Sequence, residues 1–224
     1  MSEKKIRGGS LIARAFKDKG IQHVFTLSGG FCNPALEGFM ECQMEVINCP
    51  HEQVAGHIAD GHTRITRKPA VCLVGPEGFA NAVPSMMEAW GERSPVIFIT
   101  GSSSLKRQGS GGSKEIDDVA IAAPLTKYSA SITDGTRIRE FVDKAYKIAT
   151  NGYPGAVHLS MPVDIMFSSF SEDAGLEERP FSHQTKTIVK AWPDPAQMSE
   201  ILELACNSKK TSFNWWSRSL VVGV

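Results

Sequence analysis

The sequence predicts an α/β fold, in which a doubly wound and mainly parallel sheet carries helices on both faces. Short apolar segments alternate with longer amphipathic ones along most of the chain, which is the pattern of repeated strand–helix–strand units. The segment 70–74 is apolar throughout, as expected for a strand that is covered on both faces. Because crossovers between parallel strands are right-handed, the turns after the first four strands should meet at one edge of the sheet. These turns follow Leu27, Asn48, Val74 and Thr100.

Local patterns place each element in order. Strands are predicted at 23–27, 44–48, 70–74, 95–100, 128–132 and 156–160. A helix is predicted at 10–19, with an apolar face of Leu11, Ile12, Ala15 and Phe16 and a stop at Gly20. The helix after Pro50 is predicted to carry its apolar pattern on Val54, Ala55, Ile58, Ala59 and Ile65. Further helices are predicted at 33–40, after Asn81, and at 136–150, the last with Ile138, Phe141, Val142, Ala145 and Ile148 facing inward.

Composition narrows the class of protein. The chain has 224 residues, 42% of them hydrophobic and 21% charged, and its formal net charge is zero, so no electrostatic feature favours nucleic acid or an anionic membrane. Five cysteines without a Cys-x-x-Cys pair indicate neither a disulfide framework nor a zinc knuckle. The polar N-terminus has no apolar segment behind it, and no apolar run is long enough to cross a bilayer. We expect a cytoplasmic protein, with an organelle-targeting segment left open.

Glu52 lies where the second predicted strand gives way to a helix, which is where open α/β sheets bind ligands. One interpretation is that its carboxylate offsets the positive end of the helix dipole, an effect of roughly 0.3–1 kcal/mol. The other is that it contacts a ligand. A zinc-protease helix is excluded, because His-Glu-x-x-His would require histidine at Ala55, and His57 lies too far around the helix.

The residues around Glu52 resemble a known family. The segments 51–53 (His-Glu-Gln), 59–64 (Ala-Asp-Gly-His-Thr-Arg) and 68–74 are similar to the pyrimidine-binding domain of thiamine-diphosphate enzymes. The likeness is to the acetolactate-synthase-like group, which includes 2-hydroxyacyl-CoA lyases, and it continues in 115–128 and 161–165. It implies the thiamine-diphosphate-binding fold, with thiamine diphosphate as cofactor bound here through its pyrimidine half only.

The resemblance also implies roles for individual residues. Glu52 would be catalytic, forming a hydrogen bond with the ring nitrogen N1′ of the aminopyrimidine and helping to form the reactive ylide. The other expected cofactor-binding residues are Ser28, Gly29, Gly30, Pro76, Gly78 and Asn81. For the turn at 28–30, an ordinary strand-to-helix turn is an equally good interpretation.

Two charged residues depart from the family pattern. Glu77 stands where the family keeps proline beside the cofactor, and Lys114 stands where relatives commonly carry glutamine. Lys114 and Glu115 belong to the loop that lines the substrate side in the family. Lys114 either favours an anionic substrate or is simply solvated, and the sequence leaves both possibilities open.

The sequence given does not show the motif with which the family's diphosphate-binding domain holds the other half of the coenzyme. The diphosphate domain carries Gly-Asp-Gly and a later Asn that hold a divalent metal, whereas here Asp60-Gly61 follows Ala59 and Asp134-Gly135 follows Thr133. The resemblance therefore implies no metal site in this chain and Mg²⁺ only on a diphosphate domain. We expect a homodimer or a diphosphate-domain-bearing subunit as partner, and a small-molecule substrate, either a 2-oxo acid or a 2-hydroxyacyl-CoA. Alone, the chain should bind the cofactor weakly and turn over nothing.

We expect three parts along the chain. A pyrimidine-binding domain is expected at 1–170, and a polar linker with scattered prolines at 171–194. Residues 195–224 would begin a truncated central domain, with a helix at 195–207 and its first strand at 219–224. The segment 209–218, which contains Trp215 and Trp216, does not fit a linker into that strand and indicates a truncated or frame-shifted end.

The sequence also leaves two other classes of function to consider. The chain could be a non-catalytic remnant or interaction module that retains the fold. An NAD(P)-binding domain is disfavoured, because the first strand is followed by 27–32 (Leu-Ser-Gly-Gly-Phe-Cys) rather than Gly-x-Gly-x-x-Gly. The glycine- and serine-rich segment 102–113 lacks the Gly-Lys-Ser/Thr order of a phosphate-binding loop, so a mobile active-site loop is favoured.

Overall fold

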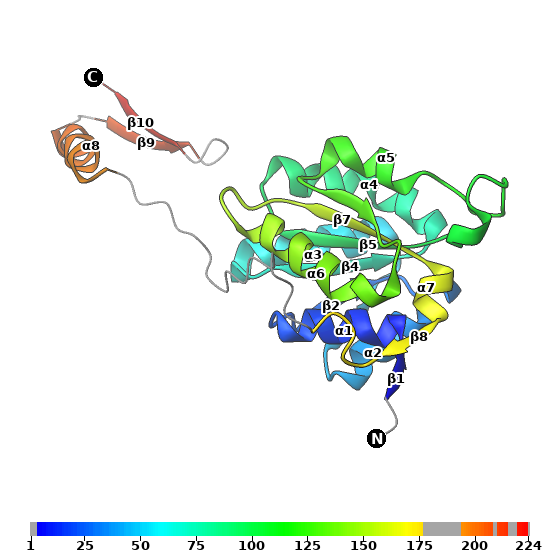
Figure 1. Cartoon of the computed structure of the whole chain (residues 1–224). Coiled ribbons are helices and arrows are strands. Elements are labelled where there is room, and N and C mark those ends of the chain that lie inside the picture. Colours follow the sequence, from blue (N-terminus) through cyan, green and yellow to red (C-terminus); the bar gives the residue numbers. More distant parts are fainter. Residues whose placement is uncertain (1–3, 177–193, 208–209, 215–218, 224) are drawn as a thin grey trace. The chain divides into compact units, whose positions relative to one another are not determined.

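The computed structural model describes residues 4–176 and 194–207 together with the strands at 210–214 and 219–223 (Figure 1). The chain divides into two compact units, Met1–Ile188 and Val189–Val224, and each is described by itself. The first unit contains the sheet and the site discussed below. In the second, helix α8 (Pro195–Asn207) matches the predicted helix, and strands β9 (Lys210–Asn214) and β10 (Ser219–Gly223) pair antiparallel. The sequence did not predict β9.

The sheet of the first unit has six strands, all parallel, in the order β3-β2-β4-β5-β7-β6. This confirms the predicted doubly wound fold. The strands are β2 (His23–Thr26), β3 (Glu45–Asn48), β4 (Ala70–Val74), β5 (Val96–Ser102), β6 (Ser129–Ser131) and β7 (Val157–Pro162). The strand that follows β2 in the chain, β3, lies on one side of it, and the strand that follows β4, β5, lies on the opposite side. The strand order therefore reverses between β2 and β4.

Helices cover both faces of the sheet (Figure 1). They are α1 (Gly8–Asp18), α2 (Asn33–Glu41), α3 (Glu52–Thr66), α4 (Pro76–Gly91), α5 (Asp118–Ala122), α6 (Ile138–Thr150) and α7 (Val163–Phe167). Alternate residues of a strand point to opposite faces. In β4, Val71 and Leu73 accordingly belong to the core under α1, α2 and α6, while Cys72 and Val74 belong to the core under α3 and α4.

Helix α1 has the predicted apolar face, although it begins two residues earlier, at Gly8. Leu11, Ile12 and Phe16 are fully buried. A Cβ atom on Gly9 would lie 2.4 Å from the backbone nitrogen of Ala35, so only glycine lets α1 and α2 approach this closely. The inward face predicted for α6 is also confirmed, since its five apolar residues are buried or pack against the core.

The side chains that helix α3 buries are not all those that were predicted. Ala55 and Ala59 are buried, but Val54, Ile58 and Ile65 are 37%, 42% and 84% exposed. The reason is the close packing of α3 on α4, where a Cβ atom on Gly56 would lie 1.8 Å from Ser85 Oγ. Small residues therefore face inward, and the larger apolar ones form an outer stripe.

Three further elements depart from the expected pattern. The helix predicted after Asn81 begins earlier, as α4 at Pro76, because proline suits the first position of a helix. Strand β1 (Lys5–Arg7) pairs antiparallel with β8 (Ser169–Ser171), and neither was predicted because each has only three residues.

Among the described residues, none of the helices combines the length and apolar character needed to cross a membrane.

Candidate functional site

A pocket opens at the carboxyl ends of β2 and β4, where the strand order reverses. Open α/β sheets bind ligands at this position, because the turns after the two strands diverge and leave a crevice between them. The pocket is lined by Leu27, Ser28, Gly29, Gly30, Phe31, Glu52, Gly75, Pro76, Glu77, Gly78 and Lys114. Seven of the nine residues predicted for the site are thus brought together from four separate segments.

Glu52 occupies the first position of α3 and directs its carboxylate into this pocket. The His51 side chain caps the helix, with Nδ1 accepting from the Gln53 amide at 3.1 Å. Asn81 does not line the pocket, but its Nδ2 donates to Glu52 Oε2 at 3.1 Å. Glu52 is half-buried, and its carboxylate lies at the carboxyl ends of the strands, beside Asn81 and Gly78. Its place in the first helical turn also keeps the dipole interpretation valid.

Gly78 makes room for the Glu52 carboxyl group. A Cβ atom at position 78 would lie 2.5 Å from Glu52 Oε1 and 2.8 Å from Cδ, so only glycine is compatible with this arrangement. By contrast, Cβ atoms added at Gly29 or Gly30 would meet nothing within 4 Å, which means that backbone borders open space there. The site therefore offers a carboxylate beside bare backbone.

Asn48 supports the site, although the sequence analysis did not single it out. It ends β3, and its Oδ1 accepts from the Ser28 amide at 3.1 Å, which ties the turn after β2 to the neighbouring strand. A polar residue at the carboxyl end of a predicted strand was the signal that could have identified it. Leu27, Phe31 and Gly75 were also not predicted, because they contribute only surface to the lining.

The two residues that depart from the family pattern meet at the rim of the pocket. Lys114 Nζ lies 2.6 Å from Glu77 Oε1. The same ammonium lies 5.7 Å from the centre of the Phe31 ring, within the range of a cation–π contact. The hydrogen bond from Lys114 lowers the pKa of Glu77, so that carboxyl group is ionised near neutral pH.

Glu115 does not line the pocket but organises the loop that carries Lys114. Its carboxylate accepts from the amide of Gly112 at 2.9 Å and from the amide of Gly109. At the other end of the loop, Asp164 accepts from Ser104 Oγ at 2.9 Å and from the Leu105 amide at 3.1 Å. The loop is therefore anchored at both ends, and a direct role for Glu115 at the substrate stays a prediction.

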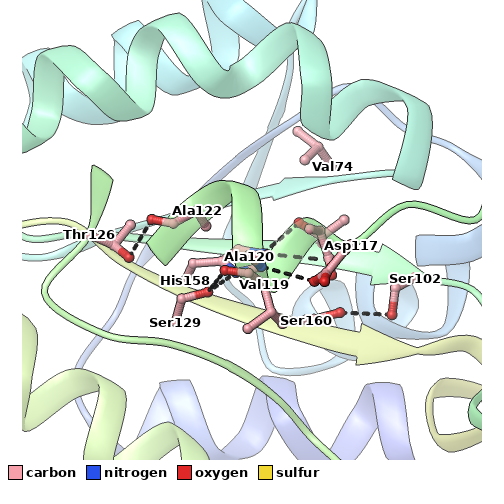
Figure 2. Close-up of polar contacts among 12 residues, drawn as sticks. Val74, Ser102, Asp117, Val119, Ala120, Ala122, Thr126, Ser129, His158 and Ser160 are labelled. Atoms are coloured by element: carbon pink, nitrogen blue, oxygen red, sulfur yellow. Dashed lines mark hydrogen bonds and ion pairs between the residues drawn. The ribbon is translucent and has the colours of Figure 1, made fainter. Parts of the chain in front are cut away.

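A buried polar network lies next to this loop, where α5 packs on β7 (Figure 2). His158 is fully buried, with Nδ1 2.9 Å from Ser129 Oγ and Nε2 2.9 Å from Thr100 Oγ1. Because Ser129 donates to the Val119 carbonyl, we assign the imidazole proton to Nδ1. Burial lowers the pKa of His158 to about 3, so the ring is neutral.

Asp118 faces this neutral ring, with Oδ2 3.8 Å from His158 Nε2 and without a hydrogen-bond partner. Burial raises the pKa of Asp118 to about 6. Phe79, in the first turns of α4, packs on the other side of the imidazole with ring centres 5.2 Å apart. The network thus connects the end of the Lys114 loop with the helix that carries Glu77 and Gly78.

Histidine, cysteine and acidic side chains are spread over the described part of the chain. Within it, no cluster of three or more His, Cys, Asp or Glu side chains is arranged to hold a metal ion. All five cysteines are free. Burial raises the pKa of Cys32 to about 12, which keeps this thiol protonated and unreactive.

A parallel α/β sheet with a pocket at its switch point defines the protein as a doubly wound α/β domain of the kind that binds ligands at the carboxyl ends of its strands. Sequence comparison makes the class specific. The family described as "Thiamine pyrophosphate enzyme, N-terminal TPP binding domain" matches residues 6–121, and the chain belongs to this family.

Relatives with curated descriptions agree with this assignment. The chain is 33% identical over 169 residues to a "Probable acetolactate synthase" of Mycobacterium bovis, which covers 75% of this chain and 31% of that protein. It is 33% identical over 162 residues to a "Probable acetolactate synthase large subunit" of Methanocaldococcus jannaschii (71% and 27%). It is 32% identical over 162 residues to "2-hydroxyacyl-CoA lyase 2" of Danio rerio (71% and 26%). The matched regions span less than a third of each relative.

Proposed function

We propose that this chain binds the aminopyrimidine half of thiamine diphosphate through Glu52, as the N-terminal part of a carboligase or lyase of the acetolactate-synthase-like group. The observation that carries the proposal is the position of Glu52. Its carboxylate is fixed by Asn81 and accommodated by Gly78, in the switch-point pocket of a chain from this family.

Each residue of the site has a defined task in this proposal. Glu52 exchanges a proton with the pyrimidine ring nitrogen, and Asn81 orients the carboxylate for that contact. The backbone at Ser28, Gly29, Gly30, Pro76 and Gly78 borders the ring and excludes water from one side. When bound, the coenzyme supplies the carbon nucleophile that carries the reaction, and the protein supplies orientation and proton transfer.

The remaining half of the active site would come from a diphosphate-binding domain, which would also hold Mg²⁺. We propose a homodimer or a diphosphate-domain-bearing subunit as the source. Four large apolar side chains on the packed helices α3 and α4 support a partner surface, since Val54, Ile58, Met87 and Trp90 are 37–58% exposed. Sedimentation velocity of the chain and of an Ile58→Glu variant tests this, and the variant should shift any assembly toward monomer.

Several finer assignments belong to the same proposal. Residues 1–170 would form the pyrimidine-binding domain, 171–194 a linker and 195–224 the start of a central domain. The substrate would be a 2-oxo acid or a 2-hydroxyacyl-CoA, and the free cysteines are compatible with a reducing compartment such as the cytoplasm.

Binding of thiamine tests the proposal directly. We expect calorimetric or NMR titration of the chain with thiamine to show saturable binding, and Glu52→Gln to weaken it at least tenfold while the circular dichroism spectrum stays the same. Glu203→Gln is the matched control, because Glu203 is exposed on α8 in the other unit. Equal binding by wild type and Glu52→Gln would refute the role of Glu52.

Catalysis requires a second test. The chain is mixed with a subunit that carries a diphosphate domain, together with thiamine diphosphate and Mg²⁺, and decarboxylation of pyruvate is measured. A gain of activity that depends on Glu52 supports the enzyme. Thiamine binding without any gain of activity favours the alternative, a non-catalytic remnant that retains the fold and its interactions.

A further inference from the structure

Gly29 and Gly30 form part of the pocket wall, and neither has a side chain that could hold it in place. Cβ atoms added at these two positions would meet nothing within 4 Å, so the wall borders open space. Glycine also loses more conformational freedom than other residues when it is ordered. The turn at 28–30 must therefore be held by the residues on either side of it.

After the turn, Cys32 attaches the chain to β4. Its Sγ donates to the Val74 carbonyl at 3.2 Å, and its amide donates to the Gly29 carbonyl at 2.8 Å. Cys32 is fully buried, so packing as well as hydrogen bonding fixes this end of the turn.

Before the turn, the Asn48 side chain extends the hydrogen-bond ladder between β2 and β3. Thr26 and Asn48 are partners in the parallel register, and the Cys49 amide donates to the Thr26 carbonyl at 2.6 Å. In a regular parallel ladder, the Ser28 amide would be the next donor and the Cys49 carbonyl its acceptor. Strand β3 ends at Asn48, however, and the chain bends at Pro50. The Ser28 amide instead donates to Asn48 Oδ1 at 3.1 Å, so a side-chain oxygen takes the place of a backbone acceptor.

We propose that Asn48 is a positioning residue of this site, which holds the turn 28–30 in the conformation that receives the aminopyrimidine ring of the coenzyme. The proposal rests on the proposed function and adds to it a residue that does not line the pocket. Asn48 ends the strand that leads into the helix of Glu52, so the end of β3 places both the turn and the carboxylate. A turn that is already ordered spares the ligand the cost of ordering it on binding.

The test compares Asn48→Ala, which removes the acceptor, with Asn48→Asp, which keeps an oxygen at the same position. In calorimetric titration of the full chain with thiamine, we expect about three- to tenfold weaker binding by Asn48→Ala, the loss expected when one ordinary hydrogen bond no longer orders the turn. Asn48→Asp should bind like wild type. Asn48 is exposed, so the melting temperature should change little in either variant. Glu45→Gln, an exposed residue at the other end of β3, is the control and should bind like wild type.

Two further measurements isolate the positioning role. Hydrogen exchange without ligand should show a faster exchange of the Ser28 amide in Asn48→Ala and the wild-type rate in Asn48→Asp, because only the first variant loses the acceptor. The carboxylate of Asn48→Asp adds a negative charge, and thiamine is a cation. The neutral hydroxymethyl aminopyrimidine that makes up this half of the coenzyme is therefore titrated as well, and it should give the same order of affinities.

The outcomes separate this inference from the proposed function. Wild-type thiamine affinity in Asn48→Ala, or an equal loss of affinity in Asn48→Asp, would overturn the inference. If thiamine binding depends on Glu52 but not on Asn48, the inference fails and the function stands. If wild type does not bind thiamine, the function fails, and the exchange rate of the Ser28 amide then decides whether Asn48 holds the turn.

Discussion

Asn81 donates a hydrogen bond from Nδ2 to Oε2 of Glu52 over 3.1 Å, which links the second turn of α4 to the first residue of α3. Helix α3 follows β3 and α4 follows β4, and β2 lies between these two strands, so this single bond spans the strand switch point at the carboxyl edge of the sheet. It fixes the direction in which the carboxylate faces and leaves its other oxygen for a ligand.

The role of this bond can be measured with Asn81→Ala. We expect thiamine affinity to fall about fivefold, because an ordinary hydrogen bond contributes about 1 kcal/mol and its loss frees the carboxylate to rotate. Asn81 is exposed, so the melting temperature should change little. Asn207→Ala, at the exposed end of α8, is the control and should bind thiamine like wild type. Full affinity in Asn81→Ala would show that Glu52 is oriented by other contacts.

Gly78→Ala should displace the Glu52 carboxyl group. The added methyl group would lie 2.5–2.8 Å from three atoms of that side chain, so we expect thiamine binding to be lost, while stability should change little because only the Glu52 side chain must move. Gly91→Ala, at the end of the same helix, meets nothing within 4 Å and should be neutral or slightly stabilising. Titration with thiamine and urea denaturation give the two readouts. Normal binding by Gly78→Ala would contradict the tight approach seen here.

Gly56→Ala tests the packing of α3 on α4. Because the new Cβ atom would lie 1.8 Å from Ser85 Oγ and 2.6 Å from Ser85 Cβ, the helices must separate, at a cost of about 1–3 kcal/mol. Gly61→Ala on the same helix adds a methyl group in open space and should stabilise by about 0.4–1 kcal/mol. Chemical denaturation measures both. Similar effects of the two substitutions would mean that the helices are not in close contact.

The raised pKa of Asp118 predicts a dependence of stability on pH. A pKa of about 6 in the folded protein, above the ordinary value of 3.8, means that the folded protein prefers the protonated acid. Stability is then greatest below the unfolded pKa and is lost as the pH rises through 6, by about 1 kcal/mol between pH 5 and 7. The physical cause is a buried carboxylate that faces a neutral imidazole instead of a cation.

Asp118→Asn removes this titration. Its free energy of unfolding should vary less between pH 5 and 7 than that of wild type, as measured by urea denaturation at each pH. Asp173→Asn, an exposed acid, should follow the wild-type curve. If wild type and Asp118→Asn gave parallel curves, Asp118 would not be the titrating group.

Much of the sheet was predictable because its signal is local. The all-apolar run of β4 and the one-sided face of α1 each depend on neighbouring residues, and both predictions are confirmed. The buried face of α3 was predicted wrongly, because hydrophobic pattern favours the larger residues while helix packing selected Gly56 and two alanines. Strands β1 and β8 gave no local signal, since each exists only by pairing with the other.

The sequence by itself determined the parallel α/β fold, the family and the place of Glu52 at a strand-to-helix junction, because these depend on residue order and local periodicity. Only the tertiary structure decided that Asn81 orients Glu52, that Gly78 must be glycine, that Asn48 ties the β2 turn, and that Lys114 pairs with Glu77. These relationships join residues 20 to 37 positions apart in the chain. Contacts of this type arise from the way the strands are ordered in the sheet, and a linear pattern carries no record of that order.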